Sequence, residues 1–466
     1  MRRLTELFGK CRYMQYLAVT SAAMAGICSY MIGSWGSPSI PKLTSSDSPI
    51  GVTLSSEEVS WVASSPLLGF ALGALTSSIP LKIIGPKWSL LSASLPIAGC
   101  WLGIAFSKSA VVLIVLRFLS GVCDGIIVTV GPLYIGEVAD KDIRGKLITF
   151  FPIFSGLGNL IVLAVGPFVE YKTLNFICAT VPILFATIFV FLPDSPYFLL
   201  RSGRGAESKR SLRRLLSNDV DDTTIDERLK EIEATIRSEG THKFNVIHMF
   251  SKKHFRFAIF ISLNTRLILA FGGMTVLKSY LQTIIGGTAS SISPEISSLI
   301  FAIAQQPPVI LTAFLVDRVG RKILLTISTL GCALMLGLEG IYFYLQRVAE
   351  IDLSAVSWLP TACLVIYSFM QPIGIGAMPS IIVGEIFADE IKSAAAGIPT
   401  TFSGSCHFLL AIFFLPISEA WGMHVMFWVF SVFCFYGAIF AMFVLPETKG
   451  KSFLEIQETL SKSRCC

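Results

Sequence analysis

Several charged side chains of this sequence lie inside segments that are otherwise apolar. Arg266 and Lys278 lie within the stretch NTRLILAFGGMTVLKSYLQ, and the carboxylates Asp124 and Glu339 interrupt two other apolar runs. A guanidinium group binds a carboxylate or a phosphate through parallel hydrogen bonds. A charge that is removed from water needs a partner, a ligand or a hydrated cavity. We therefore expect Arg266 to face one of these three.

Two pairings compete for Asp124. Arg117 lies seven residues earlier, about two helical turns away, so an Arg117–Asp124 contact competes with an Asp124–Arg266 pair. Lys278 is twelve residues beyond Arg266, which rotates it by about 120° on a helix. Its long stem favours a contact with the membrane interface, and a position inside the protein is the alternative.

A second group of charges lies where apolar segments end. The stretches YIGEVADKDIRGK and VGEIFADEIKSA each contain Gly-Glu followed by a base seven residues after the Glu, and LVDRVGRKILL has a similar mixture of charges. Clustered opposite charges at segment ends can pair in one conformation and separate in another. The residues concerned are Glu137, Arg144, Asp317, Arg321, Glu385 and Lys392.

The elements that position these charges are predicted to be membrane-spanning helices. Of the 466 residues, 53% are hydrophobic and 15% are charged, and the mean hydropathy is +0.69, which indicates an all-α integral membrane protein. A bilayer is crossed by about 20 apolar residues. The pattern predicts twelve spans, at residues 14–35, 59–80, 88–107, 111–134, 147–169, 174–192, 256–286, 296–316, 322–346, 358–384, 393–417 and 422–445.

The distribution of basic residues predicts the orientation. With the N-terminus in the cytoplasm, most of the 37 Lys and Arg residues fall on the inner side, and only Lys42, Lys108, Lys172 and Arg347 fall outside. Both termini are then cytoplasmic, and a seven-helix receptor is excluded. The net charge of +6 follows from this topology, so it indicates no nucleic-acid partner.

The chain divides into two similar parts. We expect a six-helix half at 1–192, a cytoplasmic linker at 193–255, a second six-helix half at 256–445 and a cytoplasmic tail at 446–466. The linker contains apolar residues at helical spacing, which predicts short amphipathic helices against the inner face of the membrane domain. Similar loop motifs at equivalent points of the two halves are typical of transporters built from repeats.

Five motifs occur in order along the chain. They are RFLSGVCDGIIVTVGPLYIGEVADKDIRG, which contains the motif residues Arg117, Gly121 and Gly125, followed by PDSPYFLL, DRVGRK, GEIF and PETKGKS. In these motifs the sequence resembles the sugar porters of the major facilitator superfamily, most closely the insect facilitative trehalose and hexose transporters. The resemblance implies a twelve-helix fold with a solute site between its halves.

The resemblance also implies a gating network of ion pairs on the inner side. By position, its members are Glu137, Arg144, Asp194, Asp317, Arg321, Glu385, Lys392 and Glu447. The first half departs from the family pattern, because Pro86 stands where the family has an Arg and Tyr197 replaces another Arg. The network is therefore expected to depend mainly on the second half.

The sugar contacts of the family are largely replaced. Ile268 and Leu269 stand in the place of paired glutamines, and Ser380 stands in the place of a tryptophan. The remaining candidates for a substrate site are Asn159, Arg266, Gln305, Gln371 and Ser380. Asn159 and Gln305 could line the site, or they could bond to a neighbouring helix instead.

We interpret the sequence as a facilitative plasma-membrane transporter of a sugar, trehalose or a hexose, that works by alternating access. The alternatives are a carrier of another, possibly anionic, solute held by Arg266, and a non-transporting sensor. The first span has no carboxylate, which favours facilitated diffusion over proton symport. No enzymatic, nucleotide-binding or metal motif is found, so no cofactor is expected, and the partners are a small molecule and lipid. Cys465 and Cys466 are either palmitoylated or unmodified.

Overall fold

The structure is a computed structural model, and it describes residues 13–216, 221–241, 253–288, 292–387, 392–451 and 455–456. Cys465 and Cys466 lie outside these residues. The described chain contains twelve helical segments that are long and apolar enough to cross a membrane, which confirms the predicted number. Because twelve is an even number, the last span ends on the side of the membrane on which the first span begins.

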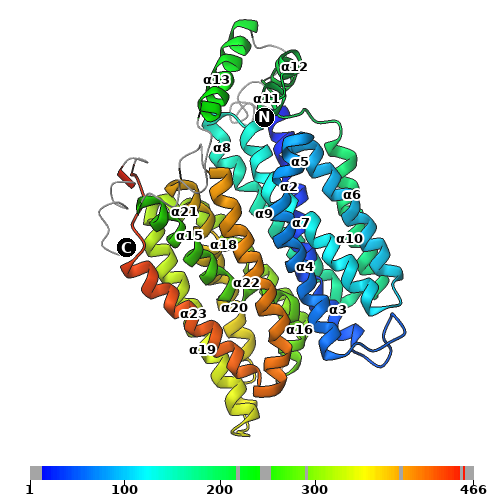
Figure 1. Ribbon diagram of the computed structural model, residues 1–466. Coiled ribbons are helices and arrows are strands. Elements are labelled where there is room, and N and C mark those ends of the chain that lie inside the picture. The colour runs from blue at the N-terminus through cyan, green and yellow to red at the C-terminus, as the bar shows by residue number, and fades with distance from the viewer. Residues whose placement is uncertain are drawn as a thin grey trace, which may run out of the picture.

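The first six spans form one group of helices, which we name the first bundle (Figure 1). Its helices are α2 (Tyr13–Ser34), α3 (Gly36–Leu43), α4 (Ser56–Thr76), α5 (Ser78–Ile83), α6 (Gly85–Phe106), α7 (Ala110–Val138), α8 (Lys141–Ile148), α9 (Phe150–Val165), η1 (Gly166–Phe168) and α10 (Tyr171–Phe189).

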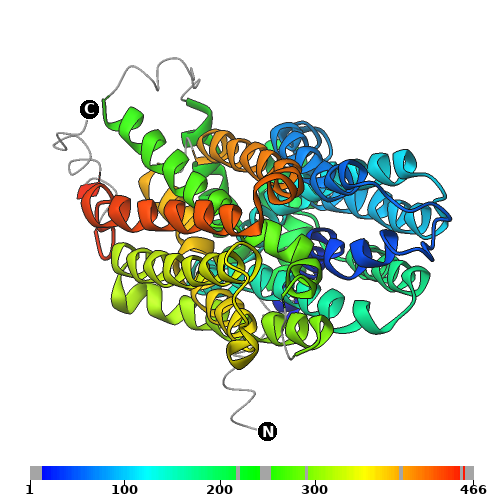
Figure 2. The ribbon, with the colours of Figure 1, turned by 90° about the horizontal axis from the view of Figure 1, so that it is seen from below.

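The last six spans form the second bundle. Its helices are α15 (Lys253–Phe271), α16 (Met274–Gly286), α17 (Pro294–Ala304), α18 (Gln306–Val319), α19 (Arg321–Arg347), η2 (Ser354–Val356), α20 (Leu359–Gln371), η3 (Pro372–Gly376), α21 (Met378–Ile386), α22 (Lys392–Trp421) and α23 (Met423–Phe443). Figure 2 shows the two bundles side by side, with α4 packed against α22, α3 against α16 and α9 against α17.

Between the bundles, the described part of the chain contains three helices, which lie at one end of the molecule that we call the linker end (Figure 1). They are α11 (Pro196–Arg201), α12 (Gly205–Leu216) and α13 (Asp222–Thr241). Leu212, Ile225 and Ile232 are buried between them, so the apolar stripe seen in the sequence joins these helices to one another. Helix α12 also contacts α2, and α11 contacts α7, so the linker helices pack on the first bundle.

Helices α4 and α7 approach each other closely because glycines line their contact. A Cβ atom added at Gly121 would lie 2.0 Å from the carbonyl oxygen of Pro66, and one at Gly125 would lie 2.3 Å from that of Phe70. Small residues allow this approach between membrane helices, where van der Waals packing provides much of the attraction. The motif glycines therefore set the distance between the second and fourth spans.

Arg117 lies one helical turn before this contact and is 1% exposed. Its guanidinium donates to the carbonyl oxygen of Ile32 at 2.8 Å and to that of Val62 at 3.4 Å. The group also lies 4.8 Å from the centre of the Trp35 ring. Arg117 thus ties α7 to α2 and α4 through backbone acceptors and a cation–π contact.

Three spans of the second bundle are interrupted, namely the seventh, the eighth, which divides into α17 and α18 at Gln305, and the tenth. Between α15 and α16, Gly273 adopts a φ of +87°, a left-handed conformation that favours glycine. The hydroxyl of Tyr367 donates to the carbonyl oxygen of Gly272 at 2.6 Å, so an acceptor beside the break is satisfied inside the protein. In the tenth span, η3 is a π-helical turn between α20 and α21, where the QPIGIG sequence predicts a break.

Candidate transport pathway between the two bundles

A chain of polar side chains crosses from the first bundle to the second. Asn159 of α9 donates to Gln305 at 2.9 Å and accepts a hydrogen bond from Ser34 of α2. Gln305, which lies between α17 and α18, donates to the sulfur of Met274 at 3.5 Å. Asn159 is 0% and Gln305 is 4% exposed. The two candidate amides are therefore buried and bonded to each other across the bundle interface.

A second amide lies next to this bridge. Gln306 donates to the carbonyl oxygen of Gly156 at 3.0 Å, and a Cβ atom at Gly156 would lie 2.4 Å from the Gln306 oxygen. The absence of a side chain at Gly156 thus lets Gln306 reach the backbone of α9. Both glutamines of the eighth span contact the fifth.

At the end opposite the linker, which we call the far end, the bundles are held together by α16. The Lys278 ammonium lies 3.8 Å from the centre of the Tyr30 ring, a cation–π contact with α2. Ser279 donates to the carbonyl oxygen of Gly33 at 3.2 Å, and the backbone of Gln282 donates to Ser37 at 3.3 Å. Lys278 therefore contacts the first bundle, whereas the sequence favoured a contact with the membrane interface. The reason is that its stem brings the ammonium to the face of the Tyr30 ring.

Arg266 forms no ion pair with any described residue. Its guanidinium donates to the hydroxyl of Ser380 on α21 at 3.3 Å, and its buried Nε has no hydrogen-bond partner among the described residues. Neither pairing considered for Asp124 is present, since Arg117 binds backbone carbonyls and one oxygen of Asp124 lacks a partner in the described part of the chain. Arg266 and Ser380 are the two site candidates that the structure joins in the second bundle.

Gln371 is 5% exposed and lies at the start of the π-helical turn. Its amide lies near Gly376, since a Cβ atom added at Gly376 would lie 3.3 Å from the Gln371 Oε1 atom. Ser328 of α19 supports the same turn, since its hydroxyl donates to Met370 at 2.8 Å and accepts from the backbone of Ile375 at 3.1 Å. The broken helix is thus held in place from α19.

At the linker end of the second bundle, four of the expected network residues meet. The Arg321 guanidinium lies 2.7 Å from Glu385 and 3.3 Å from Asp317. The carboxylate of Glu447 accepts hydrogen bonds from the backbone N–H groups of Arg321 and Lys322, at 3.0 and 3.1 Å. Glu447 follows α23, so it fastens the end of the twelfth span to the start of α19.

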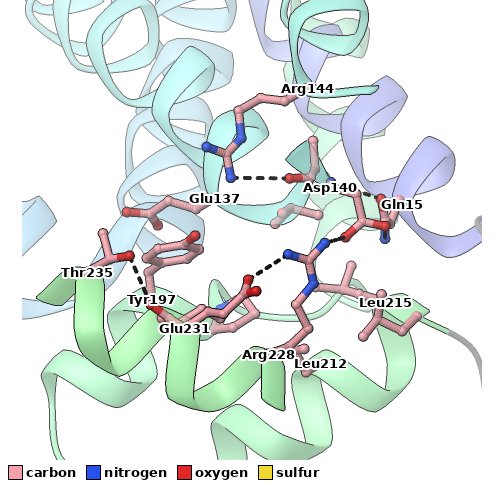
Figure 3. A pocket seen from close by; sticks show the side chains of 15 residues that line it. Gln15, Glu137, Asp140, Arg144, Tyr197, Leu212, Leu215, Arg228, Glu231 and Thr235 are labelled. Atoms are coloured by element: carbon pink, nitrogen blue, oxygen red, sulfur yellow. Dashed lines mark hydrogen bonds and ion pairs between the residues drawn. The ribbon is translucent and has the colours of Figure 1, made fainter. Parts of the chain in front are cut away.

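At the linker end of the first bundle, Asp140 is the centre of a different cluster (Figure 3). It accepts from Gln15 of α2 at 3.0 Å and lies 3.3 Å from Arg228 of α13. Arg228 also pairs with Glu231 at 2.9 Å. These residues line a small cavity of about 50 Å³ between the linker helices and the first bundle. A charged contact therefore fastens α13 to the first bundle.

The remaining expected members in this bundle have local partners. Glu137 accepts a hydrogen bond from Ser195, and Arg144 donates to the carbonyl oxygen of Ala139 at 3.5 Å. Lys87 donates to the carbonyl oxygen of Val190 at 2.9 Å and attracts Asp194 electrostatically. Burial nevertheless raises the pKa of Asp194. Lys87 thus supplies a cation next to Pro86, where the family pattern led us to expect a loss.

The ion pairs among the described residues do not join the two bundles. Each pair joins residues of one bundle, of the linker, or of the linker and the first bundle. The reason is local, since Arg321 already has Glu385 and Asp317 within its own bundle. The side chain of Lys392 lies outside the described residues.

Replacing Glu447 by glutamine should destabilise the protein by about 1–3 kcal/mol. A hydrogen bond to a charged group is worth about this much, and Glu447 also accepts from the backbone of Thr448 and Lys449, both at 3.0 Å. The thermal midpoint of the purified protein in detergent measures the loss. Asp317→Asn is the matched control, because the Asp317 side chain is 81% exposed and its pair contributes about 0–1 kcal/mol.

The same variant should reveal a pH dependence. Burial raises the pKa of Glu447, but hydrogen bonds from four backbone N–H groups lower it by a larger amount. The pKa of Glu447 is therefore below its ordinary value. A lowered pKa means that the stabilisation is complete above the ordinary value of about 4.3 and is lost as the pH falls through the lowered one. The difference in midpoint between the original protein and Glu447→Gln should be constant from about pH 8 to 5 and shrink below about pH 4. A difference that grows on acidification would contradict this.

Comparison with known protein families identifies the family of this twelve-span chain. A family model described as sugar (and other) transporter matches residues 16–460. The chain belongs to the sugar transporter family. A member of this family is a transporter and not an enzyme.

Individual relatives agree with the family. The chain is 31% identical over 412 residues to the facilitated trehalose transporter Tret1 of Bombyx mori, covering 88% of this chain and 81% of the relative. It is 29% identical over 450 residues to the protein of the same name from Polypedilum vanderplanki, covering 96% and 88%.

Solved structures of transporters share the fold. The xylose transporter XylE from E. coli, in a structure described as inward open, matches 95% of this chain and 98% of that chain with a TM-score of 0.78 and 19% sequence identity. This confirms the expected major facilitator fold of the sugar transporter.

Several residues of the pathway were not identified from the sequence. Ser34 and Tyr30 lie on α2, where they resemble ordinary residues of an apolar helix. His407 of α22 lies 3.4 Å from Ser403, measured from its Nδ1 to the hydroxyl oxygen. An imidazole within a membrane span is unusual enough to mark a site, and the four-residue spacing to Ser403 places both on one helix face.

Proposed function

We propose that this sugar transporter is a facilitative carrier of trehalose or a hexose that works by alternating access. The observation that carries the proposal is the Asn159–Gln305 hydrogen bond, because it places two amides between the bundles, away from the far-end contacts. Amides both donate and accept, so they can exchange their mutual bond for bonds to sugar hydroxyls. The names of the insect relatives support trehalose as the substrate, and the family description supports a sugar.

In this proposal the two bundles are the moving bodies. Residues 1–192 and 256–445 form the two halves, the linker 193–255 and the tail 446–466 are cytoplasmic, and the protein lies in the plasma membrane. The far-end contacts of α16 with α2 and α3 would then close the outer side. They consist of one cation–π contact and hydrogen bonds to neutral groups, so their rupture costs little compared with a buried ion pair.

Counterflow in proteoliposomes tests the proposal. Purified protein is reconstituted with unlabelled trehalose or glucose inside, and the entry of labelled sugar is followed with and without a pH gradient. We expect transient accumulation of at least one of the two sugars, with the same rate in both conditions. Protein-free liposomes provide the background. Binding without flux would instead favour a sensor, and a rate that follows the pH gradient would contradict facilitated diffusion.

A further inference from the structure

The Arg266 side chain has unused hydrogen-bond donors and no counter-charge among the described residues. It lies in the middle of the seventh span, Phe255–Gly286, and makes one long hydrogen bond to Ser380, while its buried Nε has no partner among the described residues. A guanidinium in the centre of a membrane protein is unfavourable unless it faces a partner, a cavity or water. Its bonding capacity is therefore not used within the described part of the protein.

The helices that pack on α15 carry further uncharged hydrogen-bonding groups. Ser380 is exposed on α21, and Ser403 and His407 lie on α22, where the Arg266 charge acts on the His407 ring. Helices α21 and α22 both contact α15. The Arg266 guanidinium and the Ser380 hydroxyl meet without a carboxylate bonded to either among the described residues, and such a pair of donors is suited to an oxyanion.

This cluster borders the interface between the bundles. On α22, Gly404 follows Ser403 directly and packs on Ala71 of α4, since a Cβ atom at Gly404 would lie 2.9 Å from the Ala71 side chain. The cluster therefore lies on the route that the proposed function assigns to the sugar. One turn or less beyond Arg266, Ile268 and Leu269 present apolar groups where the family has amides.

We infer that the preferred substrate of this hexose carrier is an acidic hexose, that is, a sugar acid whose carboxylate binds Arg266. The inference rests on the proposed function and names the substrate class of the same pathway. One guanidinium balances one negative charge, so a monoanionic carboxylate gives a neutral complex, whereas a phosphate dianion would leave a net charge in the membrane interior. Ser380, which already contacts Arg266, supplies a further hydrogen bond to a carboxylate oxygen.

Counterflow with three probes tests the inference: glucuronate, glucose and glucose 6-phosphate. We expect glucuronate to enter at least tenfold faster than glucose at equal low concentration, and faster than glucose 6-phosphate. In Arg266→Gln the ratio of the glucuronate rate to the glucose rate should fall at least tenfold. Arg266→Lys keeps the charge without the forked geometry and should retain an intermediate rate for glucuronate.

Arg256→Gln is the matched control, since Arg256 is an exposed arginine of the same helix, α15, and its removal should leave the ratio of glucuronate to glucose unchanged. Equal rates for glucose and glucuronate, equally affected by Arg266→Gln, would overturn the inference and leave the sugar carrier intact. A preference for glucose 6-phosphate would overturn the monoanion assignment. Failure of glucose, trehalose and glucuronate alike would overturn the proposed function itself.

Discussion

Replacing Gly121 by valine is expected to remove most of the folded protein from the membrane. Even a Cβ atom at this position would lie 2.0 Å from the Pro66 carbonyl oxygen and 2.7 Å from its Cα, so the obstacle is backbone that cannot rotate away. Overpacking costs about 1–3 kcal/mol where side chains can adjust. Here α4 and α7 must separate, so we expect a loss of about 3 kcal/mol or more.

Gly99→Val is the matched control for this substitution. Gly99 lies in the spanning helix α6, and an added Cβ atom would meet no atom within 4 Å. Fluorescence-detected size-exclusion chromatography of both variants measures the fraction of folded protein. The close approach of α4 and α7 would not be essential if Gly121→Val gave the same monodisperse peak and thermal midpoint as Gly99→Val.

The second large effect is expected at the amide bridge. Replacing Asn159 by leucine leaves the Gln305 oxygen without its donor and removes one amide from the proposed sugar pathway. An unsatisfied buried polar group costs about 1–3 kcal/mol, and about 1.4 kcal/mol corresponds to a factor of ten. We therefore expect the kcat/KM of sugar counterflow to fall about tenfold or more, with the same result for Gln305→Leu.

Asn175→Leu is the matched control for the bridge. Asn175 is also 0% exposed and bonded, since it accepts from Trp35 at 2.8 Å and donates to Tyr171 at 2.9 Å, but all three residues belong to the first bundle. This variant should lower the thermal midpoint and leave the KM of the remaining folded protein unchanged. Because Asn159 and Gln305 bond to each other, the double variant should lose less than the product of the single losses. If the loss in the double variant equalled the product of the two single losses, Asn159 and Gln305 would act independently.

The number of spans could be predicted because a membrane requires long apolar helices and the chain supplies them at regular intervals. The boundaries were harder to predict. The first span was expected at 14–35, whereas its helical segment is Tyr13–Leu43. Helix α3 continues beyond Ser34 and contains Pro41, because the packing of Ser37 and Ile40 against neighbouring helices compensates for the local preference against proline.

The candidate site could be predicted only as separate residues. Asn159 and Gln305 stand out as amides in apolar spans, but their pairing depends on how two bundles meet, which no local pattern specifies. The same holds for Lys87, whose side chain reaches the carbonyl oxygen of Val190 at the end of another span. The sequence shows Pro86 as a lost charge beside the cation Lys87, while the structure adds the backbone acceptor that this cation binds.

The contact of Arg228 with Asp140 has a practical consequence for following the transporter at work. Since α13 is fastened to the first bundle and not to the second by the described contacts, a dye attached to an exposed position of α13, such as Glu233, would travel with the first bundle. A second dye on Lys449, which is exposed and donates to the carbonyl oxygen of Arg318, would travel with the other. Energy transfer between the two dyes would then record each transport cycle in single molecules.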